Sequence, residues 1–99
     1  MKTYVTSTYF KAKETARTQE LCKILRRALE AAAGDEDRAA FDEVRLLQSS
    51  GSIYVALLVR AQSAQDAADR AERVYASALN VMGSDADALV RRQTSLSYA

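Results

Sequence analysis

The sequence predicts an α+β fold whose elements follow the order β-α-β-β-α-β. Two observations support this prediction. The stretches YVTSTYFKA at 4–12 and YVALLVRA at 54–61 are typical of strands, and a polar break and an alanine-rich helical pattern follow each of them. Each helical pattern also ends at a glycine, Gly34 or Gly83, as helices commonly do. The chain therefore divides into two similar halves, at about 4–49 and 54–98.

The first half is predicted to contain a strand, a helix and a second strand. Residues 2–12 are rich in Tyr, Thr, Val and Phe, which favour strands. A helix is expected from about 14 to 33, with charged residues opposite an apolar face. The apolar face consists of Leu21, Ile24, Leu25, Ala28 and Ala32, and the charged face of Glu20, Lys23, Arg27 and Glu30. A second strand follows over 41–49.

The second half begins after a tight turn at Ser-Gly-Ser, 50–52. The stretch 53–61 is the clearest strand, because its centre is entirely apolar. Ser63 is a suitable N-cap for the next helix, and Asp66 can complete a weak capping box. The apolar face of this helix is expected to contain Ala64, Ala67, Ala68, Ala71, Val74, Tyr75, Ala78 and Met82. Gly83 ends the helix, and a last strand is predicted from Asp87 onward.

Two interlocked β-α-β units form a ferredoxin-like sandwich. In this fold a four-stranded antiparallel sheet has the strand order 4-1-3-2, and both helices cover one face. The 99 residues correspond to one domain, 1–99, and can bury a core without disulfides. The similarity between the two halves agrees with the pseudo-twofold symmetry of this fold, although any two β-α units in an alanine-rich chain look alike.

Strand residues alternate between the two faces of a sheet. In the third strand Ile53, Val55, Leu57 and Val59 are the better core residues. The pseudo-symmetry turns Val5, Ser7 and Tyr9 of the first strand inward. The expected helix-free face then consists of Tyr4, Thr6, Thr8, Phe10, Tyr54, Ala56, Leu58 and Arg60, with Leu47 and either Leu89 or Val90 extending it. An exposed apolar face of this kind usually marks an interface or a pocket, but ordinary surfaces are also largely apolar.

Composition excludes several function classes. Fourteen Lys and Arg against thirteen Asp and Glu give a net charge of +1, which argues against strong non-specific nucleic-acid binding. No apolar run reaches the roughly 18 residues of a membrane span. The N-terminus lacks the apolar centre of a signal peptide, so a cytoplasmic location is expected. The Ala-, Arg- and Asp-rich composition fits a GC-rich bacterial or phage genome.

Little catalytic or metal-binding chemistry is evident. With no His and one Cys, the chain has no Ser-His or Cys-His pair, no imidazole zinc ligand and no internal disulfide. Cys22 is expected to be a small buried residue. The acidic stretches at 35–37 and 85–87 should lie at opposite ends of the sheet. No cofactor or metal is therefore expected.

A basic cluster marks the start of the first helix, where backbone amides also point outward. Lys11, Lys13 and Arg17 form this cluster, which is either a weak anion-binding site or a solvated basic edge. Arg91 and Arg92 are adjacent on the last strand and should point to opposite faces.

Three functional hypotheses remain open. The first is a non-enzymatic module that forms a homodimer or binds a protein partner, through the helix-free face or an edge strand. The second is a small-molecule-binding or enzymatic dimer of the α/β-barrel type, with polar groups from Tyr4, Thr6, Thr8, Tyr54 and Arg60. The third is single-stranded nucleic-acid binding, in which Tyr4 and Tyr54 would stack on bases. Phosphates would then lie near Lys2, Arg45, Arg60 and Arg91 or Arg92.

Overall fold

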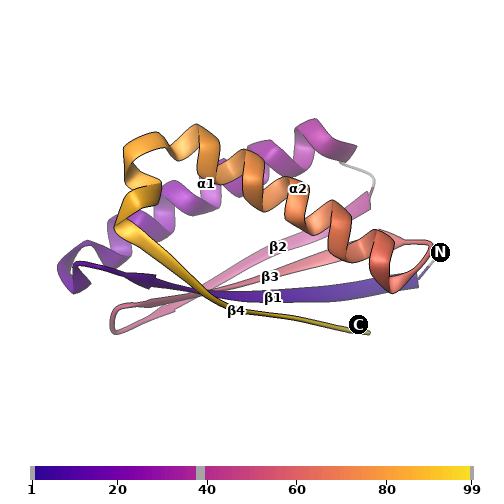
Figure 1. Ribbon diagram of the computed structural model, residues 1–99, viewed down its shortest axis with the longest axis horizontal. Helices are drawn as coiled ribbons and strands as arrows, with labels where there is room; N and C mark the ends of the chain where they lie inside the picture. The colour runs from indigo at the N-terminus through magenta and orange to yellow at the C-terminus, as the bar shows by residue number, and fades with distance from the viewer. Residues whose placement is uncertain (1, 38–39, 99) are drawn as a thin grey trace.

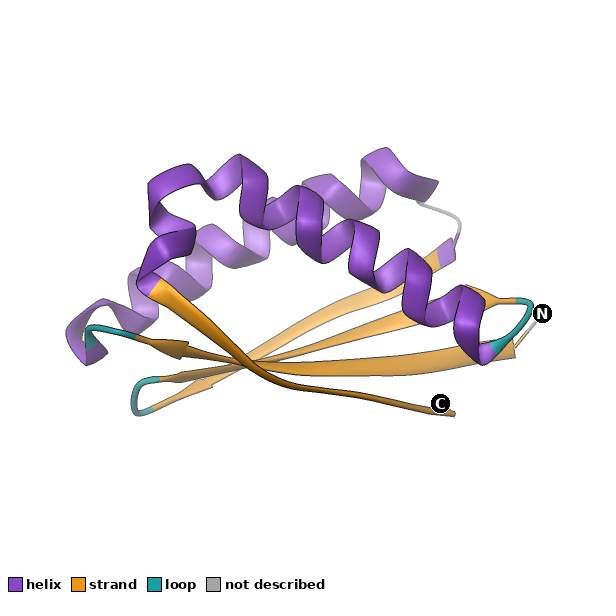
Figure 2. Ribbon diagram, in the orientation of Figure 1, coloured by secondary structure: helices purple, strands orange, loops and turns teal. Residues whose placement is uncertain are grey.

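The computed structural model describes residues 2–37 and 40–98, which form one antiparallel sheet covered by two helices (Figure 1). The strands are β1 (Lys2–Ala12), β2 (Phe41–Ser49), β3 (Ser52–Ala61) and β4 (Leu89–Tyr98), and the helices are α1 (Thr18–Asp37) and α2 (Ala64–Met82). The strand order is β2-β3-β1-β4. Both helices lie on the same side of the sheet (Figure 2). The predicted ferredoxin-like sandwich is therefore confirmed, with the predicted element order and strand order.

The end of α1 differs from the prediction. Gly34 does not cap the helix, because α1 continues through it to Asp37. Within the described residues, only Gly51 and Gly83 have a positive φ. Ala32 and Ala33 are both buried, so the apolar face of α1 continues up to Gly34 and the core retains the helix there. The expected acidic connector at 35–37 is consequently the last turn of α1, where Glu36 pairs with Arg73 of α2.

The predicted ends of α2 are confirmed. Ser63 Oγ accepts a hydrogen bond from the Asp66 N–H at 3.1 Å. The Asp66 carboxylate in turn accepts from the Gln62 N–H at 3.2 Å, one residue before the N-cap, and this bond is the main reason why the pKa of Asp66 lies below its usual value. At the other end Gly83 has φ +59° and ends the helix. A 3-10 helix, Gly83–Ala88, then leads into β4.

The core lies between the sheet and both helices. The predicted core residues of β3 are all fully buried: Ile53, Val55, Leu57 and Val59. They meet Leu21, Leu25 and Leu29 of α1 and Val74 and Tyr75 of α2. Cys22 is buried as predicted, and burial raises the pKa of its thiol. The apolar face of α2 is narrower than expected, because Ala64 is exposed and Ala68 half-buried.

No helix among the described residues is long and apolar enough to cross a membrane.

Candidate functional site

The faces of β1 are the reverse of those predicted. Tyr4, Thr6, Thr8 and Phe10 lie directly opposite Val59, Leu57, Val55 and Ile53 of β3. Opposite residues in an antiparallel pair share a face, so these four side chains point toward the helices. At most 3% of each residue is exposed. The predicted positions of Tyr4, Thr6, Thr8 and Phe10 on the helix-free face were therefore wrong.

The error arose from aligning the two halves at their starts. Matching Tyr4 with Tyr54 shifts the alignment of the two halves by one residue. A shift of one residue exchanges the two faces of a strand. The ends of the strands give the correct alignment. Ala12 and Ala61 are both buried last residues of their strands, so FKA at 10–12 matches VRA at 59–61.

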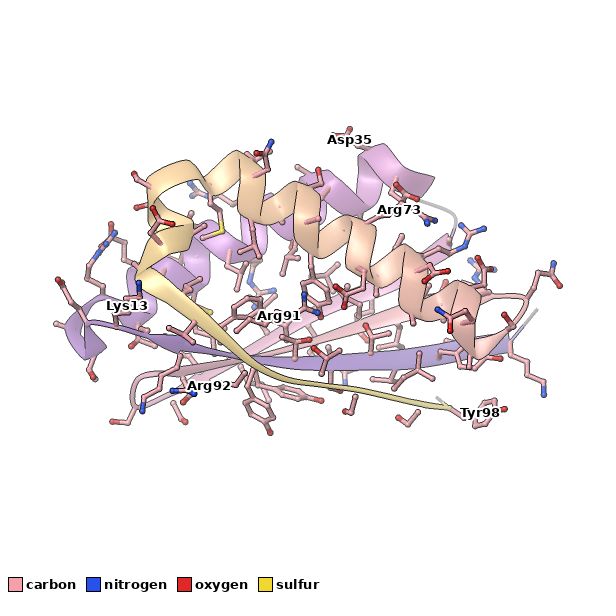
Figure 3. The ribbon with its side chains drawn as sticks, in the orientation of Figure 1. Lys13, Asp35, Arg73, Arg91, Arg92 and Tyr98 are labelled. Atoms are coloured by element: carbon pink, nitrogen blue, oxygen red, sulfur yellow. The ribbon has the colours of Figure 1, made fainter. Side chains whose placement is uncertain are left out.

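The true helix-free face combines alternate residues from all four strands. It includes Thr3, Val5, Ser7, Tyr9 and Lys11 of β1, Glu43, Arg45 and Leu47 of β2, Ser52, Tyr54, Ala56, Leu58 and Arg60 of β3, and Val90, Ser95 and Ser97 of β4. The predicted β3 residues, Tyr54, Ala56, Leu58 and Arg60, share this face as expected. Leu47 and Val90 extend it, whereas Leu89 is buried on the other side. Figure 3 shows Arg92 projecting from β4 on this side, away from the helices.

One end of this face is apolar and aromatic. Tyr9 lies directly opposite Tyr54, and their ring centroids are 5.1 Å apart at 52°. The Tyr54 hydroxyl is 3.0 Å from Ser7 Oγ, a hydrogen bond that holds the Tyr54 ring over the sheet. Leu47 is 62% exposed and Tyr9 47% exposed. These side chains, with Val5 and Leu58, give the face apolar ends around a small middle at Ser7 and Ala56.

A hollow of about 500 Å³ lies at one end of this face, beside the β2–β3 turn. Its lining consists of Tyr9, Leu47, Gln48, Ser49, Ser52 and Tyr54. Lys11 lies opposite Ser52 in the sheet, next to the hollow. Sequence reasoning missed Tyr9 because of the reversed faces of β1. The signal that could have identified it is its position opposite Tyr54 once the strand ends are aligned.

Charges on the rest of the face are already paired. Arg60 forms an ion pair with Asp42 at 2.9 Å, and Arg45 one with Glu43 at 2.6 Å. Arg91 lies on the helix side of β4, as Figure 3 shows, and pairs there with Glu72 at 2.6 Å. The prediction that Arg91 and Arg92 point to opposite faces is thus confirmed.

In the basic cluster predicted at the start of α1, Arg17 is already paired with carboxylates. Arg17 contacts Glu20 at 3.3 Å and Asp85 at 3.1 Å, and hydrogen bonds to these two carboxylates raise its pKa. Its charge is therefore already compensated. Lys11 lies on the helix-free face, and Lys13 is exposed and donates its backbone N–H to Ala88.

A buried polar cluster lies on the opposite side of the sheet, under α2. Tyr75 is fully buried, and the Arg91 guanidinium lies 4.6 Å from the centre of its ring. Burial raises the pKa of the Tyr75 hydroxyl, while the nearby hydroxyls of Thr8 and Thr6 oppose that rise. Within residues 2–37 and 40–98, Thr6 Oγ1 and the Tyr75 hydroxyl have no hydrogen bond of regular geometry. The three hydroxyls are therefore close together without being well aligned.

The raised pKa of Tyr75 predicts a loss of stability in alkali. The unfolded state loses the phenolic proton near pH 10 while the folded state keeps it, so the free energy of unfolding falls as pH rises above about 10. The slope reaches at most about 1.4 kcal/mol per pH unit and levels off above the folded pKa. Tyr75→Phe should remove this component, measured by urea unfolding between pH 8 and 11. The control is Tyr98→Phe at an exposed ring; equal slopes for Tyr75→Phe and the unmodified chain would contradict the assignment.

The described residues contain no group of three or more Cys, His, Asp or Glu side chains placed to hold a metal ion. The helix-free face offers hydroxyls, aromatic rings and cations instead. These groups are suited to apolar packing, to stacking on aromatic rings and to binding charged groups.

Comparisons with solved structures show the fold. A designed protein with a ferredoxin fold, determined by NMR, superimposes with a TM-score of 0.74 at 11% identity, covering 100% of this chain and 88% of the designed chain. A candidate antibiotic biosynthesis monooxygenase from Nitrosomonas europaea superimposes with a TM-score of 0.67 at 18% identity. The match covers 98% of this chain and 89% of that protein. A candidate antibiotic biosynthesis monooxygenase from Chloroflexus aurantiacus superimposes with a TM-score of 0.63 at 10% identity. The match covers 98% of this chain and 92% of that protein. No family model and no curated protein matches the chain. At these identities the similarity establishes that this chain has the ferredoxin-like fold.

Proposed function

We propose that the chain is a self-associating α+β module that forms a homodimer through the helix-free face of its sheet. The observation that carries this proposal is the exposed apolar surface of that face, with Leu47 62% and Tyr9 47% exposed on the side that no helix covers (Figure 2). A twofold dimer joins the same face of both chains, and this is the commonest way to bury a self-complementary patch.

The size of the face is adequate for a dimer. Four strands spaced about 4.8 Å apart and roughly ten residues long cover about 600 Å² in projection. Stable interfaces bury about 800 Å² of accessible surface per partner. The accessible area of the face is larger than its flat projection, because side chains make the surface uneven. A face-to-face dimer therefore needs most of this face, including both of its apolar ends.

One edge strand, β2, is less suitable for self-association. β2 carries Asp42, Glu43 and Arg45 along the outer edge of the sheet. Charges on an edge strand discourage pairing with another sheet. The end of the face that holds Tyr9, Tyr54 and Leu47 is apolar, which favours the face over this edge.

A second candidate is a small-molecule-binding or catalytic dimer of the α/β-barrel type. The hollow of about 500 Å³ beside Tyr9 and Tyr54 favours this alternative, because it falls in the size range of ligand pockets. The Nitrosomonas europaea and Chloroflexus aurantiacus neighbours are named as candidate enzymes, which agrees with it. At the centre of the face, however, only hydroxyls and paired charges are available for catalysis.

The proposed dimer is tested by absolute molar mass. Light scattering over a range of protein concentrations should approach twice the chain mass of 10.9 kDa as concentration rises. The dimer should dissociate on dilution in a single concentration-dependent step. A mass that stays at 10.9 kDa up to several hundred micromolar would contradict self-association, and the face would then be free for another partner.

A further inference from the structure

We propose that the hollow beside Tyr9 and Tyr54 binds a small aromatic anion, such as an aryl carboxylate or sulfonate. This inference goes beyond the proposed dimer, because a single chain provides every residue of the lining. The hollow also lies at one end of the face, beside the β2–β3 turn, on the left in Figure 1.

The aromatic part of the ligand is inferred from the shape of the lining. Tyr9 and Tyr54 present two tilted rings 5.1 Å apart, and the hydrogen bond to Ser7 fixes the orientation of the second. Aromatic rings pack well against such an arrangement, in stacked or edge-to-face geometry. Leu47 supplies an exposed apolar wall beside them. A flat ring would bury this surface without displacing any core residue.

The anionic part is inferred from the charges around the hollow. Lys11 lies opposite Ser52 of the lining, and Arg92 projects from β4 on the same face, where β4 bulges past Tyr9 (Figure 3). Neither cation has a carboxylate within ion-pair distance among the described residues, and no lining residue is acidic. By contrast, Arg45 and Arg60 farther along the face are each neutralised by a carboxylate. Unpaired positive charge is therefore concentrated at the end that holds the aromatic rings.

The polar rim completes the recognition of a carboxylate or sulfonate. Ser49, Ser52 and Gln48 all contribute to the lining, and their hydroxyl and amide groups can donate hydrogen bonds to anionic oxygens. Hydrogen bonds to a charged group are stronger than those between neutral groups.

A single nucleic-acid strand fits this face less well. Strand binding needs cations along a path that follows several phosphates. Beyond the hollow, Asp42 and Glu43 occupy the same region as Arg60 and Arg45, so a continuing phosphate chain would meet carboxylates. The charge pattern therefore favours one small anion at one end of the face.

The test is a fluorescence titration with 1-anilinonaphthalene-8-sulfonate, an aromatic sulfonate. Saturable binding of one probe per chain is expected. Tyr9→Thr should weaken it about tenfold, the range seen when a stacking ring is removed. Arg92→Gln should weaken it about threefold at low salt and less at high salt, because the attraction is screened. The matched control is Tyr98→Thr, since Tyr98 is an exposed ring elsewhere on β4 and should leave binding unchanged.

Two results would overturn the proposal. One is equal binding by Tyr9→Thr and Tyr98→Thr, which would show adsorption to apolar surface in general. The other is binding of a thymidine oligonucleotide at least tenfold tighter than binding of thymidine monophosphate, which would identify a nucleic-acid strand as the ligand. The titration is repeated with the variant Leu58→Asp, because Leu58 does not line the hollow. Binding that is retained or strengthened there supports a site within one chain, because a face-to-face dimer would compete with the probe for this end of the face; loss of binding would contradict it.

Discussion

Phe10→Ala should lower the free energy of unfolding by about 3–5 kcal/mol, the range measured when a buried aromatic residue is truncated. Phe10 is 1% exposed, lies opposite Ile53 and has its ring centroid 6.2 Å from that of Tyr75. The loss is large compared with a total stability of about 5–15 kcal/mol. This substitution is the strongest test of the face assignment in β1.

The matched control is Tyr9→Ala at the preceding residue. Tyr9 is 47% exposed and packs against Tyr54, so its loss should cost only about 0.5–1.5 kcal/mol. Urea unfolding of both variants, at a concentration where light scattering shows a monomer, separates stability from association. Equal losses, or a larger loss for Tyr9→Ala, would show that the faces of β1 are assigned the wrong way round.

Leu58→Asp should weaken the dimer by at least about a hundredfold. Leu58 is half-buried on the helix-free face, beside Val5. In a face-to-face dimer each new carboxylate would lose its water without gaining a partner, at a cost of several kcal/mol, and each 1.4 kcal/mol or so is a tenfold change in affinity. The dissociation constant is measured by sedimentation equilibrium.

The control is Val81→Asp, which places the same charge on α2. Val81 is 72% exposed and lies on the opposite side of the protein from this face, so association should be unchanged. Glu43 lies opposite Leu58, so repulsion between carboxylates should also lower the stability of Leu58→Asp slightly. Circular dichroism therefore accompanies the measurement. A folded Leu58→Asp chain that dimerises as tightly as Val81→Asp would place the interface elsewhere.

The elements and their order could be predicted because each depends on local patterns. The apolar centre of β3 marks a buried strand, and Ser63 and Gly83 mark the ends of α2 through backbone hydrogen bonding and a positive φ. The interlocking of two β-α-β units then follows from known topology. The predicted strand order agrees with the structure because this topology also fixes the order of the strands in the sheet.

The faces of β1 could not be predicted from its own residues. Tyr4, Thr6, Thr8 and Phe10 alternate with Val5, Ser7 and Tyr9, so both sets contain aromatic and small polar side chains. The choice between them is made by tertiary packing, since Tyr75 of α2 lies over Phe10 and near Thr6 and Thr8. Gly34 is a similar case, because core contacts of the preceding alanines override the tendency of glycine to end a helix.

Half of the residues predicted to lie on the helix-free face therefore lie there. The β3 residues Tyr54, Ala56, Leu58 and Arg60 share the helix-free face, but their partners on β1 are the residues expected in the core. The pairing of Arg17 with Asp85 could not be predicted from the sequence either, because the two residues are 68 positions apart. Such a contact depends on the completed fold and leaves no local pattern.

The measurement that tests the central claim most directly is isotope-filtered NMR on a mixture of labelled and unlabelled chains, which detects contacts between protomers only. A dimer formed through the helix-free face predicts intermolecular contacts from the methyl groups of Leu58, Val5 and Leu47. Contacts that instead involve Val81 and Leu79 of α2, with none from the sheet methyls, would contradict this account of how the protein associates.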